Sequence, residues 1–171
     1  MDLCDNNISD INILEKVNFK NLKILNLGEN EISDIKVLER VKFDKLESLD
    51  LYSNKISDIN VLENSNFPKL KYLYLSFNNI SDIKVLAKVE FKELQELYLI
   101  SNKISDINIL AKANFNKLKE LSLEENEISD INVLEKVHFE ELDVLFLNHN
   151  EISDINVLDR KSTRLNSSHD Q

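Results

Sequence analysis

The segment "LKILNLGENEISDIKVLERVKFDK" at residues 22–45 decides the fold, because the chain repeats it without insertions. Further copies begin at Leu46, Leu70, Leu94 and Leu118. An incomplete copy, "LDVLFLNHNEISDINVL", fills residues 142–158, and the first 21 residues fit a copy that starts partway through. A fixed period of this length is typical of a solenoid, in which each repeat packs only on its neighbours. We therefore predict one solenoid over residues 1–158, with about six and a half repeats of 24 residues.

The first part of each copy has the alternation of a β-strand. In "LKILNL", apolar and variable residues follow one another with period two, which directs successive side chains to opposite faces. We expect Leu25 and Leu27 to point into the solenoid, and Ile24, Asn26 and Gly28 to face outward.

The pattern "LxxLxLxxNxI" resembles the consensus of leucine-rich repeats, and leucine fills all three of its leucine slots in six copies. The "SDIxVL" that follows is most similar to repeats of the internalin type and to those of an intracellular phosphatase-1 regulator. The resemblance implies an α/β fold of horseshoe shape, with a concave parallel β-sheet and short convex helices. It also implies a non-enzymatic module that binds proteins.

One asparagine recurs where each repeat must turn. Because an amide has both donors and acceptors, a stacked column of asparagines can satisfy the backbone groups of neighbouring turns. A row of solvent-exposed polar residues is the alternative, but it does not explain why Ser, Lys or Asp never replaces Asn. The predicted ladder consists of Asn6, Asn30, Asn54, Asn78, Asn102, Asn126 and Asn150.

The "SDI" of each copy predicts the start of a short helix. Ser33 or Asp34 is suited to cap it, and Ile35, Leu38 and Val41 then share one helical face. A calcium ladder is the alternative, since stacked carboxylates would lie about 4.8 Å apart and calcium prefers oxygen ligands. Calcium-binding repeats are rich in glycine, however, and this chain has one. We therefore expect caps and no metal.

A phenylalanine closes each unit and predicts a stacked spine inside the solenoid. Its members are Phe19, Phe43, Phe67, Phe91, Phe115 and Phe139.

The outward slots of the strands vary, so we expect function there. All four tyrosines occupy these slots, and they gather around "YLYLSFN" at residues 72–78. Exposed aromatic clusters are typical of interaction sites. The alternative is that the aromatic residues are merely tolerated at these slots, because β-strands favour them. The predicted binding residues are Tyr52, Tyr72, Tyr74, Phe77, Tyr98, Ile100 and Phe146.

Acidic residues lie beside this cluster, and we add Glu96, Glu120 and Glu124 to the predicted binding face. The chain carries a formal net charge of −10. Such a surface disfavours nucleic acid and anionic membranes and suits a basic protein or peptide. A surface that merely promotes solubility is the alternative.

The composition offers little for catalysis. Three histidines, one cysteine and one glycine provide no phosphate-binding loop, no His/Cys metal spacing and no nucleophile–base pair, so we expect no cofactor. The lone Cys4 and the absence of a signal peptide or transmembrane run favour a cytoplasmic location. Three functions remain open: an intracellular scaffold or regulator, a secreted or surface adhesin of internalin type, and the repeat arm of a larger enzyme.

The last segment, "DRKSTRLNSSHDQ" at residues 159–171, departs from the repeat. Its first eleven residues match the translation of a common sequencing adapter, so we interpret the segment as non-native; a basic, Ser-rich tail is the alternative. Neither end of the chain resembles the polar cap that a solenoid needs, and we expect the repeats to be truncated at both ends.

Overall fold

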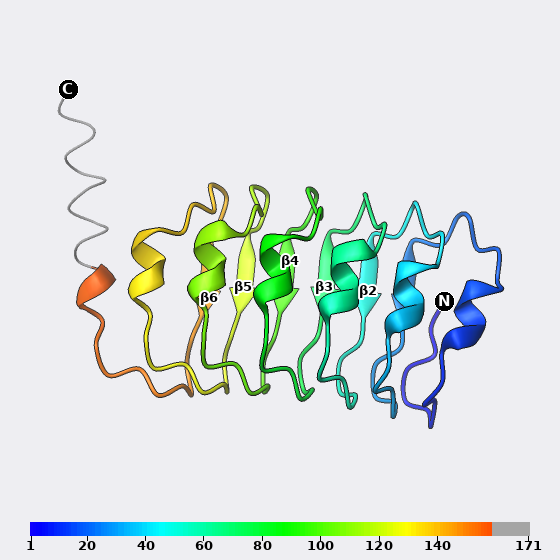
Figure 1. Cartoon of the computed structure of the whole chain (residues 1–171), viewed down its shortest axis with the longest axis horizontal. Coiled ribbons are helices and arrows are strands. Elements are labelled where there is room, and N and C mark those ends of the chain that lie inside the picture. The colour runs from blue at the N-terminus through cyan, green and yellow to red at the C-terminus, as the bar shows by residue number, and fades with distance from the viewer. Residues whose placement is uncertain (159–171) are drawn as a thin grey trace.

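A computed structural model describes residues 1–158 as a row of stacked repeats, with strands behind and helices in front (Figure 1). Within these residues the strands form one six-stranded parallel sheet in the order β1-β2-β3-β4-β5-β6. The strands are β1 (Ile24–Asn26), β2 (Ser48–Asp50), β3 (Tyr72–Tyr74), β4 (Glu96–Tyr98), β5 (Glu120–Ser122) and β6 (Val144–Phe146). Each residue pairs with the residue 24 positions further on, as Leu25 does with Leu49.

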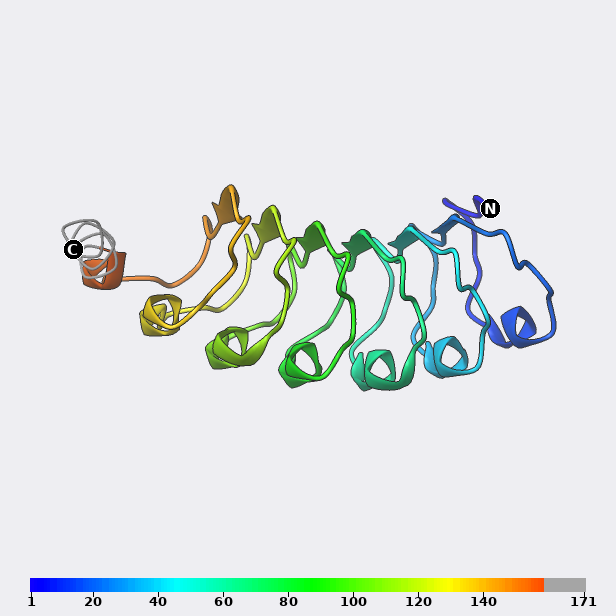
Figure 2. The ribbon, with the colours of Figure 1, turned by 90° about the horizontal axis from the view of Figure 1, so that it is seen from above.

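Each repeat returns through a short 3₁₀ helix on the opposite side. In the described residues these are η1 (Asn12–Glu15), η2 (Lys36–Glu39), η3 (Asn60–Asn64), η4 (Lys84–Ala87), η5 (Asn108–Lys112) and η6 (Asn132–Glu135). Figure 2 shows the strands along the concave side and the helices along the convex side, which confirms the predicted leucine-rich-repeat solenoid. Leu38 within η2 is buried, and so are Ile35 and Val41 on either side of this helix, as their spacing predicts. None of the described helices has the length or apolar character needed to cross a membrane.

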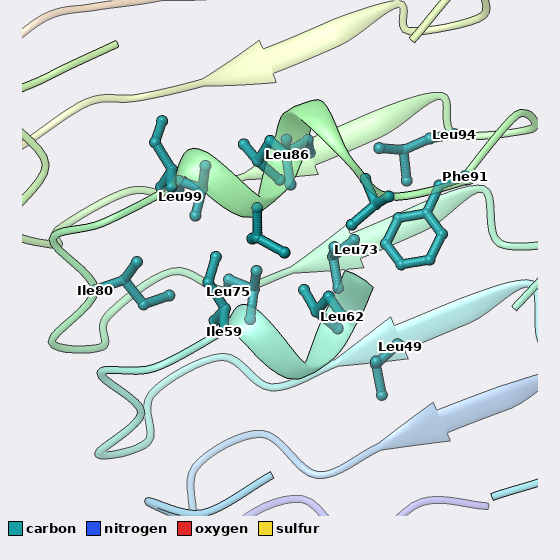
Figure 3. Close-up of a cluster of buried hydrophobic side chains, with 14 of the residues drawn as sticks. Leu49, Ile59, Leu62, Leu73, Leu75, Ile80, Leu86, Phe91, Leu94 and Leu99 are labelled. Atoms are coloured by element: carbon teal, nitrogen blue, oxygen red, sulfur yellow. The ribbon is translucent and has the colours of Figure 1, made fainter. Parts of the chain in front are cut away.

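The core lies between the sheet and the helices and runs from Ile11 to Val157. Figure 3 shows leucines and isoleucines of successive repeats meeting there, with Phe91 at one end of the cluster. Leu73 and Leu75, the inward residues at β3, are fully buried. The period-two alternation therefore orients the strands as the sequence predicts.

The asparagine column bonds each repeat to the one before it. The side-chain nitrogen of Asn54 donates to the carbonyl of Leu27 in the preceding repeat, at 3.0 Å. It also donates to the carbonyls of Leu51 and Tyr52 in its own turn. Its Oδ1 accepts the backbone N–H of Ile32 at 2.9 Å. One buried side chain thus satisfies backbone groups in two neighbouring turns.

The aspartate of each "SDI" bonds to the start of the helix that follows. Asp34 Oδ1 accepts the N–H of Lys36, the first residue of η2, at 2.9 Å. The N-cap position itself is Ile35, so the prediction that Ser33 or Asp34 fills it is wrong by one or two residues. Bonds equivalent to that of Asp34 recur from Asp10 to Asp154, so an aspartate still satisfies the first N–H. Among residues 1–158, no three His, Cys, Asp or Glu side chains form a group that could hold a metal ion.

The phenylalanine spine is present, but one predicted member does not belong to it. The rings of Phe67 and Phe91 stack with centroids 6.4 Å apart, and those of Phe115 and Phe139 are 6.1 Å apart. Phe19 is 41% exposed, so its prediction as a buried spine residue is wrong. Among residues 1–158 this repeat packs on the following repeat alone, which leaves the ring partly uncovered.

Candidate functional site

Aromatic and aliphatic side chains from three successive repeats surround one depression on the concave face. The depression has a volume of about 250 Å³. Its lining consists of Asp50, Tyr52, Tyr74, Ser76, Phe77, Tyr98 and Ile100, and we call it the aromatic depression. The structure therefore brings together five residues that the sequence singles out, and the register of β2, β3 and β4 is the reason.

Two ring contacts hold the walls of the depression. The centroids of Tyr52 and Phe77 lie 5.1 Å apart with an interplanar angle of 62°, an edge-to-face arrangement. Tyr74 lies opposite Tyr98 in the sheet, and their centroids are 5.0 Å apart. Such pairs contribute about 0.5–1.5 kcal/mol beyond the burial of their area. The rings are thus already ordered, which lowers the entropy that a ligand must lose on binding.

Each of two tyrosines is bonded to a glutamate on the next strand. The hydroxyl of Tyr74 donates to Glu96 Oε2 at 2.8 Å, and that of Tyr98 donates to Glu120 Oε1 at 2.7 Å. Burial, followed by the carboxylate that accepts the hydrogen bond, holds the pKa of both tyrosines far above the ordinary value. The hydroxyls therefore stay protonated, and the two carboxylates are fixed beside the rings.

Asp50 lies at the other side of the depression. It is half-buried, and its Oδ1 accepts the N–H of Tyr52 at 2.9 Å. Burial raises the pKa of Asp50, the hydrogen bond from Tyr52 opposes that change, and the charge of Asp2 adds to it. The depression thus has carboxylates at both sides.

Phe77 has a backbone conformation that is unusual for a large side chain. Its φ is 57°, in the left-handed region, as at the equivalent Ser53, Ser101 and His149 of other repeats. The left-handed conformation costs an L-residue about 1–2 kcal/mol, and a bulky residue is rare there. The Phe77 ring is nevertheless 43% exposed and touches Tyr52. The turn itself does not require a phenylalanine, because other repeats make it without one.

We expect Phe77→Asn to leave the free energy of unfolding within about 1 kcal/mol of the parent, because asparagine tolerates a left-handed φ and offsets the lost ring contact. Urea denaturation followed by circular dichroism measures this. Ser53→Asn, at the same slot with φ 51°, is the matched control and should be neutral or slightly stabilising. A loss of more than about 2 kcal/mol on Phe77→Asn alone would mark the ring as structural.

Some predicted site residues lie outside the depression. Tyr72 is half-buried on β3 but does not line it, and Phe146 is 40% exposed on β6, two strands beyond β4. Glu124 lies after β5 and its Oε2 accepts the hydroxyl of Ser122. Glu96 and Glu120, which accept the hydroxyls of Tyr74 and Tyr98, therefore border the depression, whereas Glu124 and Phe146 do not line it.

The sequence-based selection missed two lining residues, Asp50 and Ser76. Both occupy outward slots of the strands that carry the tyrosines. A selection that included every outward slot of these strands, and not the aromatic residues alone, would have found them.

Gly28 does not have the exposure that its outward slot suggests. It occupies an outward slot but is buried, because Asn26 and Asp50 crowd it: a Cβ there would lie 3.2 Å and 3.5 Å from their side-chain oxygens.

Comparison with family models matches most of the repeats. The model "Leucine Rich repeats (2 copies)" matches residues 44–88 and 92–136, and a second, "Leucine Rich repeat", matches residues 20–35. A search of the curated proteins found no match.

Solved structures with a similar fold include two from Listeria monocytogenes. Internalin C2 is 32% identical, with a TM-score of 0.74, over 91% of this chain and 64% of its own. An internalin, InlF, is 30% identical, with a TM-score of 0.65, over 95% of this chain and 51% of its own. A plant peptide hormone receptor, RGFR1, solved in complex with RGF2, is 24% identical with a TM-score of 0.61. The match covers 83% of this chain and 23% of the receptor chain, and it shows a shared fold alone. The present chain thus spans less than two thirds of the length of each.

Proposed function

The chain belongs to the leucine-rich repeat family, and on that premise we propose that its concave face binds a protein or peptide through the aromatic depression. The fold is that of a protein–protein interaction module. One observation carries the more specific proposal: five aromatic or aliphatic side chains from three repeats surround a single depression on the face that the helices leave uncovered.

The repeat frame does not require the aromatic residues. Tyr52 and Phe77 are 37% and 43% exposed, and other repeats form the same strands and turns with Asn, Ser or Glu at these slots. The left-handed conformation of Phe77 recurs at this slot in the other repeats and so belongs to the turn. Exposed tyrosines are frequent among the residues that dominate binding energies.

We infer a non-enzymatic role as an intracellular scaffold or regulator with a basic partner. The acidic residues that border the depression support the basic partner, and the single Cys4, which forms no disulfide within the described residues, is compatible with a reducing compartment. The plant receptor solved with its peptide hormone offers a parallel for ligand binding by this fold.

The second candidate is a surface recognition protein of internalin type, which the similarity to two internalins favours. The two candidates place the protein in different compartments. Immunodetection in fractionated source cells distinguishes them, because a scaffold would be found with cytosolic proteins and a recognition protein with the envelope or the medium.

Replacing Tyr74 and Tyr98 together with alanine tests the proposed site. Peptides selected from a display library against the parent chain serve as probes, and isothermal calorimetry measures their affinity. We expect the double variant to bind them at least about a hundredfold more weakly, since a single dominant side chain contributes 2 kcal/mol or more. The fold should persist, because both side chains lie on the concave surface.

Ile24→Ala is the matched control for this experiment. Ile24 is an apolar residue on the same face, 57% exposed on β1, but it does not line the depression. It should bind the selected peptides as the parent does. Equal affinity of the double variant and the parent would place the binding site on another surface.

A further inference from the structure

Every charged side chain in the outward slots of the concave face is acidic. These slots are the three outward positions at each strand and the left-handed position that follows them, the slot of Phe77. From Asp2 to His149 they hold no lysine or arginine. The acidic residues are Asp2, Asp5, Glu29, Asp50, Glu96, Glu120, Glu124 and Glu125. The lysines of the repeats occupy other positions, so these slots are negative although the repeats contain many cations.

The concave acids also lack ion-pair partners. Within residues 1–158, each salt bridge uses a carboxylate from another surface. Glu47, for example, lies 2.8 Å from both Lys23 and Lys71, and these two cations lower its pKa to about 2. In the described part of the chain no salt bridge reaches Glu29, Glu124 or Glu125, and Glu29 and Glu124 accept hydrogen bonds from the neutral Cys4 and Ser122. Their charges remain available to a ligand.

The unpaired acids lie on both sides of the aromatic depression. The depression is centred on β3, Glu29 follows β1, and Glu124 and Glu125 follow β5. Parallel strands are about 4.8 Å apart, so each acidic group lies two strands, roughly 10 Å, from the centre. An extended peptide advances about 3.3 Å per residue, and three residues span the same distance.

We propose that the ligand is an extended segment of a protein with a large aliphatic side chain at its centre and an arginine or lysine about three residues away on each side. This inference rests on the proposed function. The central side chain enters the aromatic depression, and the two cations meet Glu29 on one side and Glu124 with Glu125 on the other. An extended segment that crosses the strands presents side chains to all three places at once.

The size and chemistry of the depression fit one side chain. Pockets that enclose a drug-sized molecule measure about 300–1,000 Å³, so about 250 Å³ suits a single aliphatic group. Cations that pass over Tyr52 or Tyr98 also gain attraction from the faces of the rings. Exposed charge pairs add modest affinity, but they set register and speed association, so the spacing of the cations becomes a specificity element.

Synthetic peptides test the spacing directly. The probe is a fluorescein-labelled peptide of nine residues with a central leucine, arginines three positions to either side, and glycine or serine elsewhere. Fluorescence anisotropy with the full chain measures its affinity. We expect about tenfold weaker binding when the arginines stand next to the leucine, and none measurable with glutamates in their place. Binding of the parent peptide should weaken as salt is added.

Protein variants assign the contact. The double variant Glu124→Gln with Glu125→Gln should bind the arginine peptide about tenfold more weakly, because it removes the charges on one side. Glu90→Gln with Glu93→Gln is the matched control, since both carboxylates lie off the concave face in salt bridges, and it should bind as the parent does.

Three results would each overturn the inference: no binding of the arginine peptide at millimolar concentration, equal binding of the two spacings, or unchanged binding by the Glu124/Glu125 variant. The proposed function fails separately. Library-selected peptides that lack the two cations can still bind the parent chain and bind the Tyr74→Ala, Tyr98→Ala double variant more weakly. That result would support the proposed binding face and contradict only the predicted spacing of cations in the ligand.

Discussion

Replacing Asn78 with alanine should lower the free energy of unfolding by about 3–5 kcal/mol, because the substitution removes four hydrogen bonds of this side chain. The Asn78 side-chain nitrogen donates to the carbonyls of Leu51, Leu75 and Ser76. Its Oδ1 accepts the N–H of Ile56. Alanine leaves the buried N–H of Ile56 without its partner, which costs about 1–3 kcal/mol. Each of the three carbonyls keeps one other donor, so the loss of its bond to Asn78 costs about 0.5–1.5 kcal/mol. Urea denaturation followed by circular dichroism measures the loss.

Asn6→Ala is the matched control. Asn6 occupies the same slot but is exposed, and its side-chain nitrogen donates to Leu3 and Cys4 in its own turn. We expect a cost below about 1 kcal/mol, because water can replace the lost partner. In hydrogen exchange, Asn78→Ala should reduce protection first around β2 and β3, since a solenoid is stabilised by nearest-neighbour contacts. Equal, small effects of the two substitutions would show that the asparagine column stabilises little.

The second large effect is expected at Phe91. This ring is 2% exposed and stacks on Phe67 at 6.4 Å, so Phe91→Ala removes buried contacts and leaves a cavity. Substitutions of this kind cost about 3–5 kcal/mol. The free energy of unfolding, obtained by the same denaturation experiment, should fall by that amount, with the midpoint moving to lower urea concentration.

Phe19 provides the comparison within the spine column. It fills the same slot of the first repeat but is 41% exposed, so Phe19→Ala should cost less than about 1.5 kcal/mol. A loss at Phe19 as large as that at Phe91 would contradict the exposure of this ring. A small loss at Phe91 would mean that the neighbouring leucines collapse into the space that the ring leaves.

The sequence predicts the repeating frame well, that is, the residues that recur in every repeat. Each of them makes its contacts within one repeat or with the equivalent residue of the next repeat. The alternation around Leu25 and Leu27, and the aspartate before each helix, depend on local spacing alone. Once the period of 24 residues is known, the register of the sheet follows from it. The spine at Phe91 follows for the same reason.

Features that depend on unlike neighbours could not be predicted in this way. The bonds from Tyr74 to Glu96 and from Tyr98 to Glu120 join different slots on adjacent strands, and no periodic pattern indicates them. The burial of Gly28 depends on Asn26 and Asp50, which are particular to that place. The positive φ of Phe77 could not be predicted from the sequence either. Glycine is the usual indicator of a left-handed residue, and it does not occupy this slot in any repeat.

The constant register of the sheet has a consequence for how such a protein can change. Asn54, Leu49 and Phe67 maintain contacts between repeats, whereas Tyr52 and Phe77 occupy slots that the frame leaves free. Unequal recombination in steps of 24 codons would keep every frame contact and move the aromatic residues along the surface as a block. Ligand preference can therefore diverge among duplicated copies while each copy inherits an intact scaffold.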